Sequence, residues 1–422
     1  MRDCKTELKK GITVHKLETN KFKTNLCSVF LTTPLERDNI TFNSILPMIL
    51  RRGTNKIKSQ DEISKGLEGM YGADFDCGIE KTGDNQVLKF YLESLNDDFI
   101  ENNENILKQS LDLLIDIVFN PLIENDSFKK EYVDGEKQNL KQIIEGKIDN
   151  KAKFAYDRCI EEMYKDKPYG LYKFGYIEDL DKINEKNLYE YYEKFIAECK
   201  IDIFISGRNI DKADKIIEEN EIINSINPRE PRFVWNFENE QNKKKEPTIV
   251  EDKMQVTQGK LVLGLDICNL SEEEKYILSV YNILLGGSAN SKLFQNVREK
   301  ASLAYTCGSS YLRQKNNIII RAGIEIDKYN DALELIKKQI LDMEKTEFTD
   351  GEVENAKQLI ISTVQGLEDS QDSEITYYFG QEISKQSTEI EQYVDNIKKV
   401  LPKQINEIAK KVSINTIYFL RN

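Results

Sequence analysis

The chain has 422 residues, of which 39% are hydrophobic and 32% charged, and its formal net charge at pH 7 is −13. A chain of this length fits about two to four domains, and its hydrophobic content suffices for packed cores, which excludes a disordered protein. The acidic balance excludes a general nucleic-acid binder, because binding to phosphates requires a basic surface.

The N-terminal residues MRDCKTELKK contain no apolar segment typical of a signal peptide. No stretch of the chain approaches the ~18 consecutive apolar residues that a transmembrane helix needs. The seven cysteines are scattered and include no C-x-x-C pair, which is typical of free thiols in a reducing compartment. We therefore expect a soluble, cytoplasmic protein.

Histidine occurs once, at His15, in the stretch GITVHKLETNKFKTN. Serine and cysteine triads, and most zinc sites, use histidine side chains. The single histidine therefore argues against a Ser/His/Asp or Cys/His enzyme, and we interpret His15 as a structural residue of an amphipathic strand. The numerous carboxylates single out no pair suited to glycoside hydrolysis.

The first half of the chain predicts an apolar helix before Gly53, a polar amphipathic helix that ends near Tyr71, and a strand pair joined by the turn EKTGDNQ. Amphipathic helices are expected over 105–120, 126–165 and 184–198, because apolar residues recur there at helical spacing. A buried strand closing on Gly207 and a helix over 211–226 complete this half.

The segment 227–252 contains three of the eight prolines, the only tryptophan and a run of charges. Such a composition predicts a linker, since connections within a compact domain are shorter. The lysines at 243–245 are interpreted as part of a solvated loop rather than an anion site. We thus predict an N-terminal domain over 1–226, a linker over 227–252 and a C-terminal domain over 253–422.

The second half repeats the order of elements seen in the first. A strand over 259–270 precedes an apolar helix, Gly287, a polar helix, Tyr305 and a strand pair around RQKNN, and helices follow over 329–345 and 350–383. The 18 residues from Gly53 to Tyr71 match the 18 from Gly287 to Tyr305, which indicates an internal duplication. The predicted fold class is α+β, with two homologous domains, each a largely antiparallel sheet with helices packed on one face.

Several stretches resemble the insulinase/pitrilysin-type zinc peptidases, and in particular their short two-domain members such as mitochondrial processing peptidase. The most specific is LLGGSANSKLFQNVREKASLAY, which is similar to the signature of the family's C-terminal domain. LRRGTNK, GMYGADFD and KPYGLYKFGYIEDLDKI resemble landmarks of its N-terminal domain. The resemblance covers nearly the whole chain and implies two domains of the processing-peptidase type.

Catalytic members of that family carry an inverted zinc motif, H-x-x-E-H, on the helix before this Gly-Thr. Aligned on RRGT, the motif positions fall on Ser44, Pro47 and Met48. Serine is a poor zinc ligand, proline has no side-chain base and removes a helical hydrogen bond, and a thioether suits copper(I) better than zinc. We expect the helix either to kink at Pro47 or to start late.

The family's third zinc ligand is a Glu seven residues after another Glu on a later helix. Here Glu136 takes the first position and Ile143 the ligand position. Glu145 lies two residues further on, about 200° around the helix axis, and so cannot replace the ligand. The resemblance therefore implies a degenerate zinc site, with no metal or cofactor in this chain and no peptidase activity of this chain alone.

The resemblance also implies a substrate-facing pair in the C-terminal domain, Arg298 and Tyr305. The tyrosine would hydrogen-bond the oxyanion of the tetrahedral intermediate, and the arginine would hold the substrate backbone. From spacing alone, the alternative is that Arg298 pairs with a neighbouring glutamate and Tyr305 packs at the start of a strand. Gly286 and Gly287 are a weaker candidate for a substrate loop, with a turn between helices as the alternative.

Two functions stay open at this point. The first is a zinc-free subunit of a heteromeric metallopeptidase, which supplies Arg298 and Tyr305 to a zinc-bearing partner of similar size that cleaves peptides. The second is a non-catalytic peptide-binding or scaffold protein of the same fold, like the family's relatives in respiratory complexes. Neither involves nucleic acid or a membrane, and the sequence leaves open whether a homodimer forms when the partner is absent.

Overall fold

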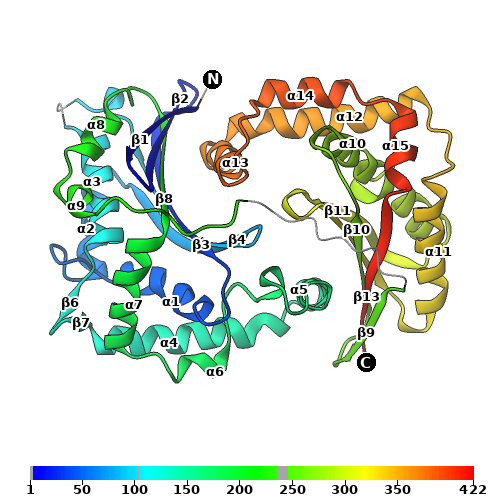
Figure 1. Cartoon of the computed structure of the whole chain (residues 1–422), viewed down its shortest axis with the longest axis horizontal. Helices are drawn as coiled ribbons and strands as arrows, with labels where there is room; N and C mark the ends of the chain where they lie inside the picture. The colour runs from blue at the N-terminus through cyan, green and yellow to red at the C-terminus, as the bar shows by residue number, and fades with distance from the viewer. Residues whose placement is uncertain (1–2, 102–103, 236–245) are drawn as a thin grey trace. The chain divides into compact units, whose positions relative to one another are not determined.

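The computed structural model describes residues 3–101, 104–235 and 246–422. The chain divides into two compact units (Figure 1). The first comprises Met1–Glu145, Leu171–Trp235 and Leu367–Ser387, and the second Gly146–Gly170, Asn236–Gly366 and Thr388–Asn422. The central part of the predicted linker, with the lysines at 243–245, lies outside the described residues.

The first unit is built on a six-stranded sheet with the order β1-β2-β8-β3-β5-β4. The pair β2–β8 is parallel and the other pairs are antiparallel. Figure 1 shows most of the unit's helices on one face of this sheet. The strands are β1 (Asp3–Lys9), β2 (Ile12–Glu18), β3 (Thr24–Pro34), β4 (Asp74–Thr82), β5 (Asn85–Leu95) and β8 (Lys200–Gly207), and the principal helices are α1 (Ile40–Leu50), α2 (Gln60–Gly69), α3 (Ile106–Phe119), α4 (Lys130–Glu145) and α7 (Glu185–Glu198).

Shorter elements connect these parts of the first unit. The expected helix over 211–226 forms as two short helices, α8 and α9, with Asn220 capping the second one by accepting hydrogen bonds from two backbone amides. The remaining short elements are β6 (Ile123–Glu124), β7 (Ser127–Phe128), α6 (Ile177–Leu180), α8 (Ala213–Glu218) and α9 (Glu221–Ser225).

The second unit contains a five-stranded sheet with the order β11-β12-β10-β13-β9. Between its first helix and β11 the chain forms two π-helical segments, η4 (Ile283–Gly287) and η5 (Phe294–Lys300). The strands are β9 (Thr248–Lys253), β10 (Gly259–Ile267), β11 (Ala304–Leu312), β12 (Asn317–Ile324) and β13 (Val412–Arg421), and the helices on one face are α10 (Glu272–Asn282), α11 (Tyr329–Asp342), α12 (Asp350–Gln365), α14 (Ile390–Lys398) and α15 (Pro402–Ala409).

The two sheets share one topology. Read from β9, the strand order of the second sheet is β9-β13-β10-β12-β11, which corresponds to β2-β8-β3-β5-β4 of the first sheet. The single parallel pair is the first pair in each order, β9–β13 in the second sheet and β2–β8 in the first. The first sheet adds only β1 at its edge. The predicted α+β class with two homologous, largely antiparallel domains is therefore confirmed.

Each unit also receives one helix from the opposite half of the sequence, and that helix covers the second face of the sheet (Figure 1). In the second unit α5 (Lys151–Met163) buries Cys159 and Met163 against Val262 and Tyr418. In the first unit α13 (Gln371–Ile383) places Phe379 on Phe30, with ring centroids 4.1 Å apart. The sequence did not indicate these exchanges, and the boundaries at 226 and 253 stay a prediction.

Several helices begin where side chains can satisfy the free backbone amides of a first turn. Ser271 with Glu274, and Thr349 with Glu352, form reciprocal capping boxes at the starts of α10 and α12. In the part of the chain that the structure describes, no helix combines the length and the apolar character required to span a bilayer.

Candidate functional site

The helix α1 carries the positions where zinc ligands are expected, and Ser44 is its first such position. Ser44 is completely buried, and its Oγ lies 2.7 Å from the carbonyl oxygen of Ile40 and 3.0 Å from that of Lys173. It also accepts a hydrogen bond from Gln86 Nε2 at 3.2 Å. The hydroxyl thus helps to anchor the loop around Lys173 to the helix, and its hydrogen-bonding capacity is used within the protein.

Pro47 and Met48 occupy the other two motif positions. The helix runs from Ile40 to Leu50 with Pro47 inside it, so it does not start late. The Pro47 carbonyl oxygen accepts hydrogen bonds from Arg51 N at 3.3 Å and Cys77 Sγ at 3.4 Å. Met48 is partly buried and packs against the hydrophobic core. Both side chains therefore serve packing, and neither offers a base.

The helix α4 presents the third ligand position, and α1 packs against this helix. Ile143 is 38% exposed, and Glu145 lies near Lys141 on the exposed surface. Glu136, in contrast, is buried and forms an ion pair with Arg52. A buried carboxylate that is already neutralised by a guanidinium is a poor ligand for a second cation.

The residues at these four positions do not fit a catalytic zinc ion. Zinc in peptidases is held by imidazole and carboxylate groups, with one position left for water. Here the positions offer a buried hydroxyl, a ring without a polar side-chain atom, a thioether and an aliphatic chain: Ser44, Pro47, Met48 and Ile143.

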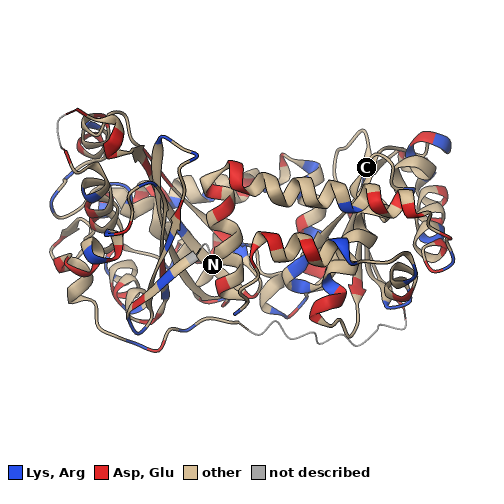
Figure 2. Ribbon diagram, turned by 90° about the horizontal axis from the view of Figure 1, so that it is seen from above, with Lys and Arg blue, Asp and Glu red and all other residues tan. Residues whose placement is uncertain are grey.

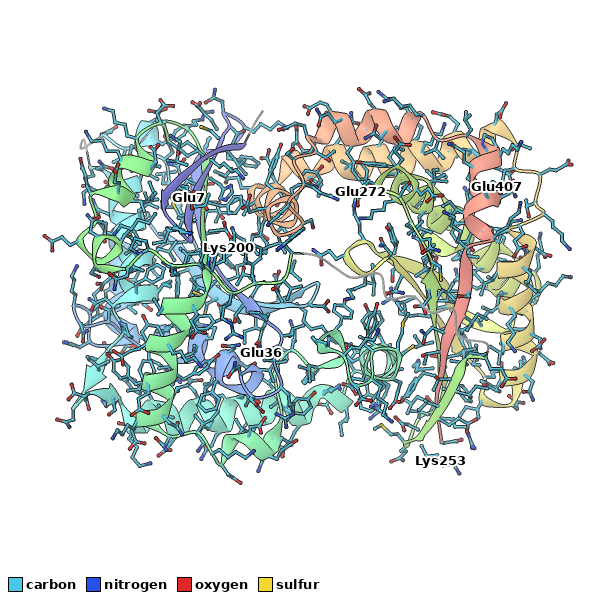
Figure 3. All side chains as sticks on the ribbon, in the orientation of Figure 1. Glu7, Glu36, Lys200, Lys253, Glu272 and Glu407 are labelled. Carbon is cyan, nitrogen blue, oxygen red and sulfur yellow. The ribbon has the colours of Figure 1, made fainter. Side chains whose placement is uncertain are left out.

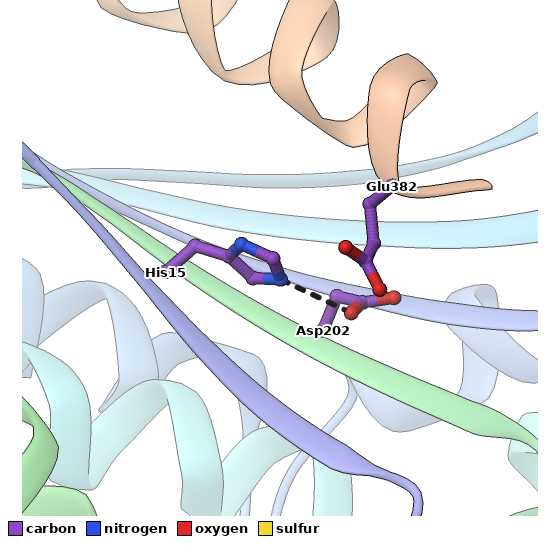
Figure 4. A group of neighbouring side chains, drawn as sticks. All are labelled: His15, Asp202 and Glu382. Atoms are coloured by element: carbon purple, nitrogen blue, oxygen red, sulfur yellow. Dashed lines mark hydrogen bonds and ion pairs between the residues drawn. The ribbon is translucent and has the colours of Figure 1, made fainter. Parts of the chain in front are cut away.

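Among the described residues, one group of side chains could by composition hold a metal: His15, Asp202 and Glu382 (Figure 4). His15 Nε2 lies 3.3 Å from Asp202 Oδ1, and the imidazole stacks on Phe204 with centroids 4.0 Å apart. His15 and Asp202 are fully buried on neighbouring strands, while Glu382 projects from α13.

Lys200 supplies the positive charge that this group requires. Its ammonium forms an ion pair with Asp202 and lies 3.2 Å from Glu382 Oε1. Burial disfavours the charged forms of all three groups. The attraction between the Lys200 ammonium and the two carboxylates outweighs this effect, so that the pKa of Lys200 is raised and the pKa values of Asp202 and Glu382 are lowered. A metal ion would have to displace this ammonium, so we interpret the cluster as a charge network that joins α13 to the sheet.

Arg298 lies on the π-helical segment η5 of the second unit. Its side chain is 40% exposed, with Glu299 Oε1 3.5 Å away, and its guanidinium lies over the ring of Phe294 at 4.5 Å. This contact with Glu299 corresponds to the alternative weighed from spacing. Because an exposed ion pair at this distance contributes little, it leaves the guanidinium available to another anion or to a peptide carbonyl.

Tyr305 lies at a β-bulge near the start of β11. Ala304 pairs with Ile324 and Thr306 pairs with Gly323, so Tyr305 is the extra residue between two neighbouring pairs. The side chain is 60% exposed, and its hydroxyl makes no hydrogen bond to any of the described residues. A bulge redirects a side chain out of the regular sheet, so Tyr305 does not pack at the strand start as the alternative required.

Gly286 and Gly287 end the other π-helical segment, η4, which precedes Arg298 by one short stretch of chain. A Cβ on Gly286 would lie 2.6 Å from the backbone nitrogen of Ser309, and one on Gly287 would lie 2.8 Å from Ile283 Cδ1. Gly286 thus permits a close approach of η4 to β11, and Gly287 leaves room for the side chain of Ile283 within η4. Their role as a substrate loop stays a prediction.

Together, the fold and this site define a class of protein. The chain has the duplicated sheets of a two-domain peptidase, but the positions for the metal are filled by packing and hydrogen-bonding groups. It is a metallopeptidase-like protein whose expected metal-ligand positions carry no zinc-binding side chains.

Comparison with known proteins identifies the family. The family described as "Peptidase M16 inactive domain" matches residues 182–360. A Bacillus subtilis (strain 168) protein described as "Probable inactive metalloprotease YmfF" is 32% identical over 416 residues, which cover 97% of this chain and 96% of the relative. This chain therefore belongs to the M16 peptidase family, and the resemblance to insulinase/pitrilysin-type peptidases is confirmed.

More distant relatives and solved structures are similar to parts or all of this chain. A Rickettsia felis protein described as an uncharacterized zinc protease is 28% identical over 243 residues, covering 57% of this chain and 54% of the relative. A conserved protein from Enterococcus faecalis V583 has a similar structure, with a TM-score of 0.90, 25% identity and coverage of 100% and 99% of the two chains. A peptidase M16 inactive domain from Pseudomonas fluorescens shares the fold, with a TM-score of 0.79, 18% identity and coverage of 100% and 98%.

Proposed function

We propose that this chain is the zinc-free subunit of a two-chain metallopeptidase. In this assembly a partner of similar size carries the complete H-x-x-E-H motif and its zinc. This chain contributes Arg298 and Tyr305 to the bound peptide, and an interface on the order of 2,000 Å² or more would join the two chains.

One contrast between the units carries the proposal. The metal-ligand positions of the first unit are occupied by packing and hydrogen-bonding groups, among them the fully buried Ser44. Arg298 and Tyr305 in the second unit keep exposed polar ends, and both lie on local irregularities of the backbone. Irregular segments of this kind are frequent at functional sites, and a stable fold alone requires no exposed phenol there.

The chemistry assigned to this pair needs no metal in this chain. A phenol can donate its hydrogen bond to the oxygen that becomes negative as water adds to a peptide carbonyl. Loss of such a donor costs about 3–4 kcal/mol of transition-state stabilisation. The guanidinium of Arg298 presents several fixed donors, which suit the carbonyl groups of an extended peptide.

The test is reconstitution with the zinc-bearing chain that co-purifies with this one. Neither chain alone should hydrolyse a peptide, and the mixture should. Tyr305→Phe should lower kcat by about 100-fold or more and change KM little, because the lost hydrogen bond forms in the transition state.

Tyr71→Phe is the matched control, since Tyr71 is the duplicate counterpart of Tyr305 and is 49% exposed. It should leave kcat unchanged. If Tyr305→Phe and Arg298→Gln leave the activity of the mixture intact, the proposal is wrong, and the chain is instead a peptide-binding or scaffold subunit. Peptide hydrolysis by this chain alone would also overturn it.

A further inference from the structure

A groove of about 440 Å³ lies in the second unit, where the segment leading into η5 meets the end of α11. Its volume lies within the range of small-molecule sites. The lining combines basic, amide and hydroxyl groups with one carboxylate and one aliphatic side chain: Lys292, Asn296, Leu335, Lys338, Gln339, Asp342, Lys345 and Thr346.

The charge of this lining contrasts with that of the chain. The whole protein carries a net charge of −13, whereas the groove gathers three lysines around a single carboxylate. Lys338 and Lys345 form no ion pair with any described residue. The Lys292 ammonium lies 5.5 Å from the ring centroid of Phe348 and near enough to the Glu352 carboxylate to help lower its pKa. Neighbouring Lys337 is by contrast paired with Glu334 at 2.9 Å.

Gln339 adds a second and independent observation. Its side chain is 4% exposed, and Asn296 Nδ2 donates a hydrogen bond of 2.5 Å to its Oε1. That bond fixes the orientation of the amide and leaves its NH₂ group without a hydrogen bond to any of the described residues. Since Gln339 lines the groove, this oriented donor is available there to an acceptor supplied from outside the chain.

Asp342 and Thr346 limit the chemistry of such a ligand. Thr346 Oγ1 donates to the backbone carbonyl oxygen of Asp342 at 2.6 Å, so its lone pairs and the Asp342 carboxylate remain as acceptors. Acceptors beside three cationic donors suit a molecule with an anionic end and a hydroxyl-bearing end.

We infer that this groove binds a small phosphorylated molecule through Lys292, Lys338, Lys345 and the amide of Gln339. The phosphate oxygens accept from the ammonium groups and from Gln339 Nε2. Asp342 accepts from a hydroxyl of the ligand. Neither Arg298 nor Tyr305 is among the lining residues of the groove, and the inference does not depend on the proposed peptidase function.

The test is calorimetric titration of the full chain with inorganic pyrophosphate and, separately, with ribose 5-phosphate at low ionic strength. The paired variant Lys338→Gln/Lys345→Gln should bind both at least about tenfold more weakly, because it loses two charge-assisted contacts. Gln339→Glu, which keeps the size of the side chain but replaces the donor with an acceptor, should weaken binding as well. Lys275→Gln/Lys337→Gln is the control, since it removes the same charge from lysines that are already paired with Glu272 and Glu334.

The control variant should bind like the parent protein, and raising the salt concentration should weaken binding in both. Absence of measurable binding at millimolar ligand would overturn the inference. An equal loss of affinity in the two double variants, Lys338→Gln/Lys345→Gln and Lys275→Gln/Lys337→Gln, would overturn it too, because binding would then depend on net charge rather than on this groove. Circular dichroism and thermal unfolding of each variant establish that a loss of binding does not come from unfolding.

Discussion

Replacement of Asp202 by asparagine should loosen the helix α13 from the first unit. Asp202 is fully buried, and it holds the ammonium of Lys200, which in turn lies 3.2 Å from Glu382 on α13. Removing one partner of a buried ion pair costs about 3–5 kcal/mol. Since Lys200 retains Glu382, and since loss of the Asp202 charge also relieves its repulsion of the Glu382 carboxylate, we expect a smaller loss of about 2–3 kcal/mol in the free energy that opposes opening of α13.

Native-state hydrogen exchange of the amides of α13 measures this change. A loss of about 2–3 kcal/mol should accelerate exchange roughly 30- to 150-fold, since each 1.4 kcal/mol corresponds to a factor of ten. Asp134→Asn is the control, because Asp134 forms a solvent-exposed i,i+4 pair with Lys130 on α4, and such a pair contributes little to stability. An acceleration in α13 no greater than that of the control would refute the interpretation of the cluster as the attachment of this helix.

The same network predicts how stability depends on pH. Lys200 and His15 hold the pKa of Asp202 below its ordinary value of 3.8, and Lys200 holds that of Glu382 below 4.5. A carboxylate with a lowered pKa in the folded state stabilises the fold above its unfolded pKa, and this contribution is lost as the pH falls through the folded pKa. The thermal midpoint should therefore decline below about pH 4, and the decline should be shallower in Asp202→Asn.

Two further substitutions test the local packing. Ser44→His should destabilise the first unit by about 1–3 kcal/mol in chemical unfolding without creating zinc affinity, because the imidazole must displace the carbonyl of Lys173 from a fully buried position; unchanged stability would show that the site has room for a ligand. Gly286→Ala should destabilise the second unit by a similar ~1–3 kcal/mol, since the added Cβ would lie 2.6 Å from the Ser309 nitrogen; Gly351→Ala, where a Cβ meets nothing within 4 Å, should be neutral or stabilising.

Much of the fold could be predicted from the sequence, because the patterns that indicate its helices and strands are local and occur in both halves of the chain. The matched spacing of Gly53 to Tyr71 and Gly287 to Tyr305 predicted the duplication, and the common strand order of the two sheets confirms it. The apolar pattern over 259–270 predicted β10, and 105–120 predicted α3. The spacing of apolar residues within each of these segments is enough to identify it as a helix or a strand, without knowledge of its distant contacts.

The exchange of α5 and α13 could not be predicted in this way. Both helices have ordinary amphipathic patterns, and nothing in such a pattern says which sheet will cover the apolar stripe. The partners of Phe379 and Glu382 lie more than 170 residues away along the chain, at Phe204 and Lys200. For the same reason, the only histidine gave no sign that Asp202 would lie beside it.

The candidate site likewise has some features that residue types predict and others that depend on tertiary structure. Loss of zinc ligands was evident from residue types alone, since serine, proline and isoleucine cannot replace imidazole and carboxylate. Two other features depend on contacts between distant segments and could not be predicted from the sequence. They are the ion pair of Arg52 with Glu136 and the bulge at Tyr305. The π-helical geometry around Arg298 likewise depends on the packing of η5, and no local sequence motif predicted it.

The central claim is that this chain does not hold a catalytic zinc and that its chemistry requires a second chain. The most direct measurement is the zinc content and peptide hydrolysis of the isolated, full-length chain after equilibrium dialysis against zinc, compared with the complex purified through the same chain. We predict no stoichiometric zinc and no hydrolysis for the isolated chain, and both for the complex. One tightly bound zinc per isolated chain, accompanied by hydrolysis, would contradict the account.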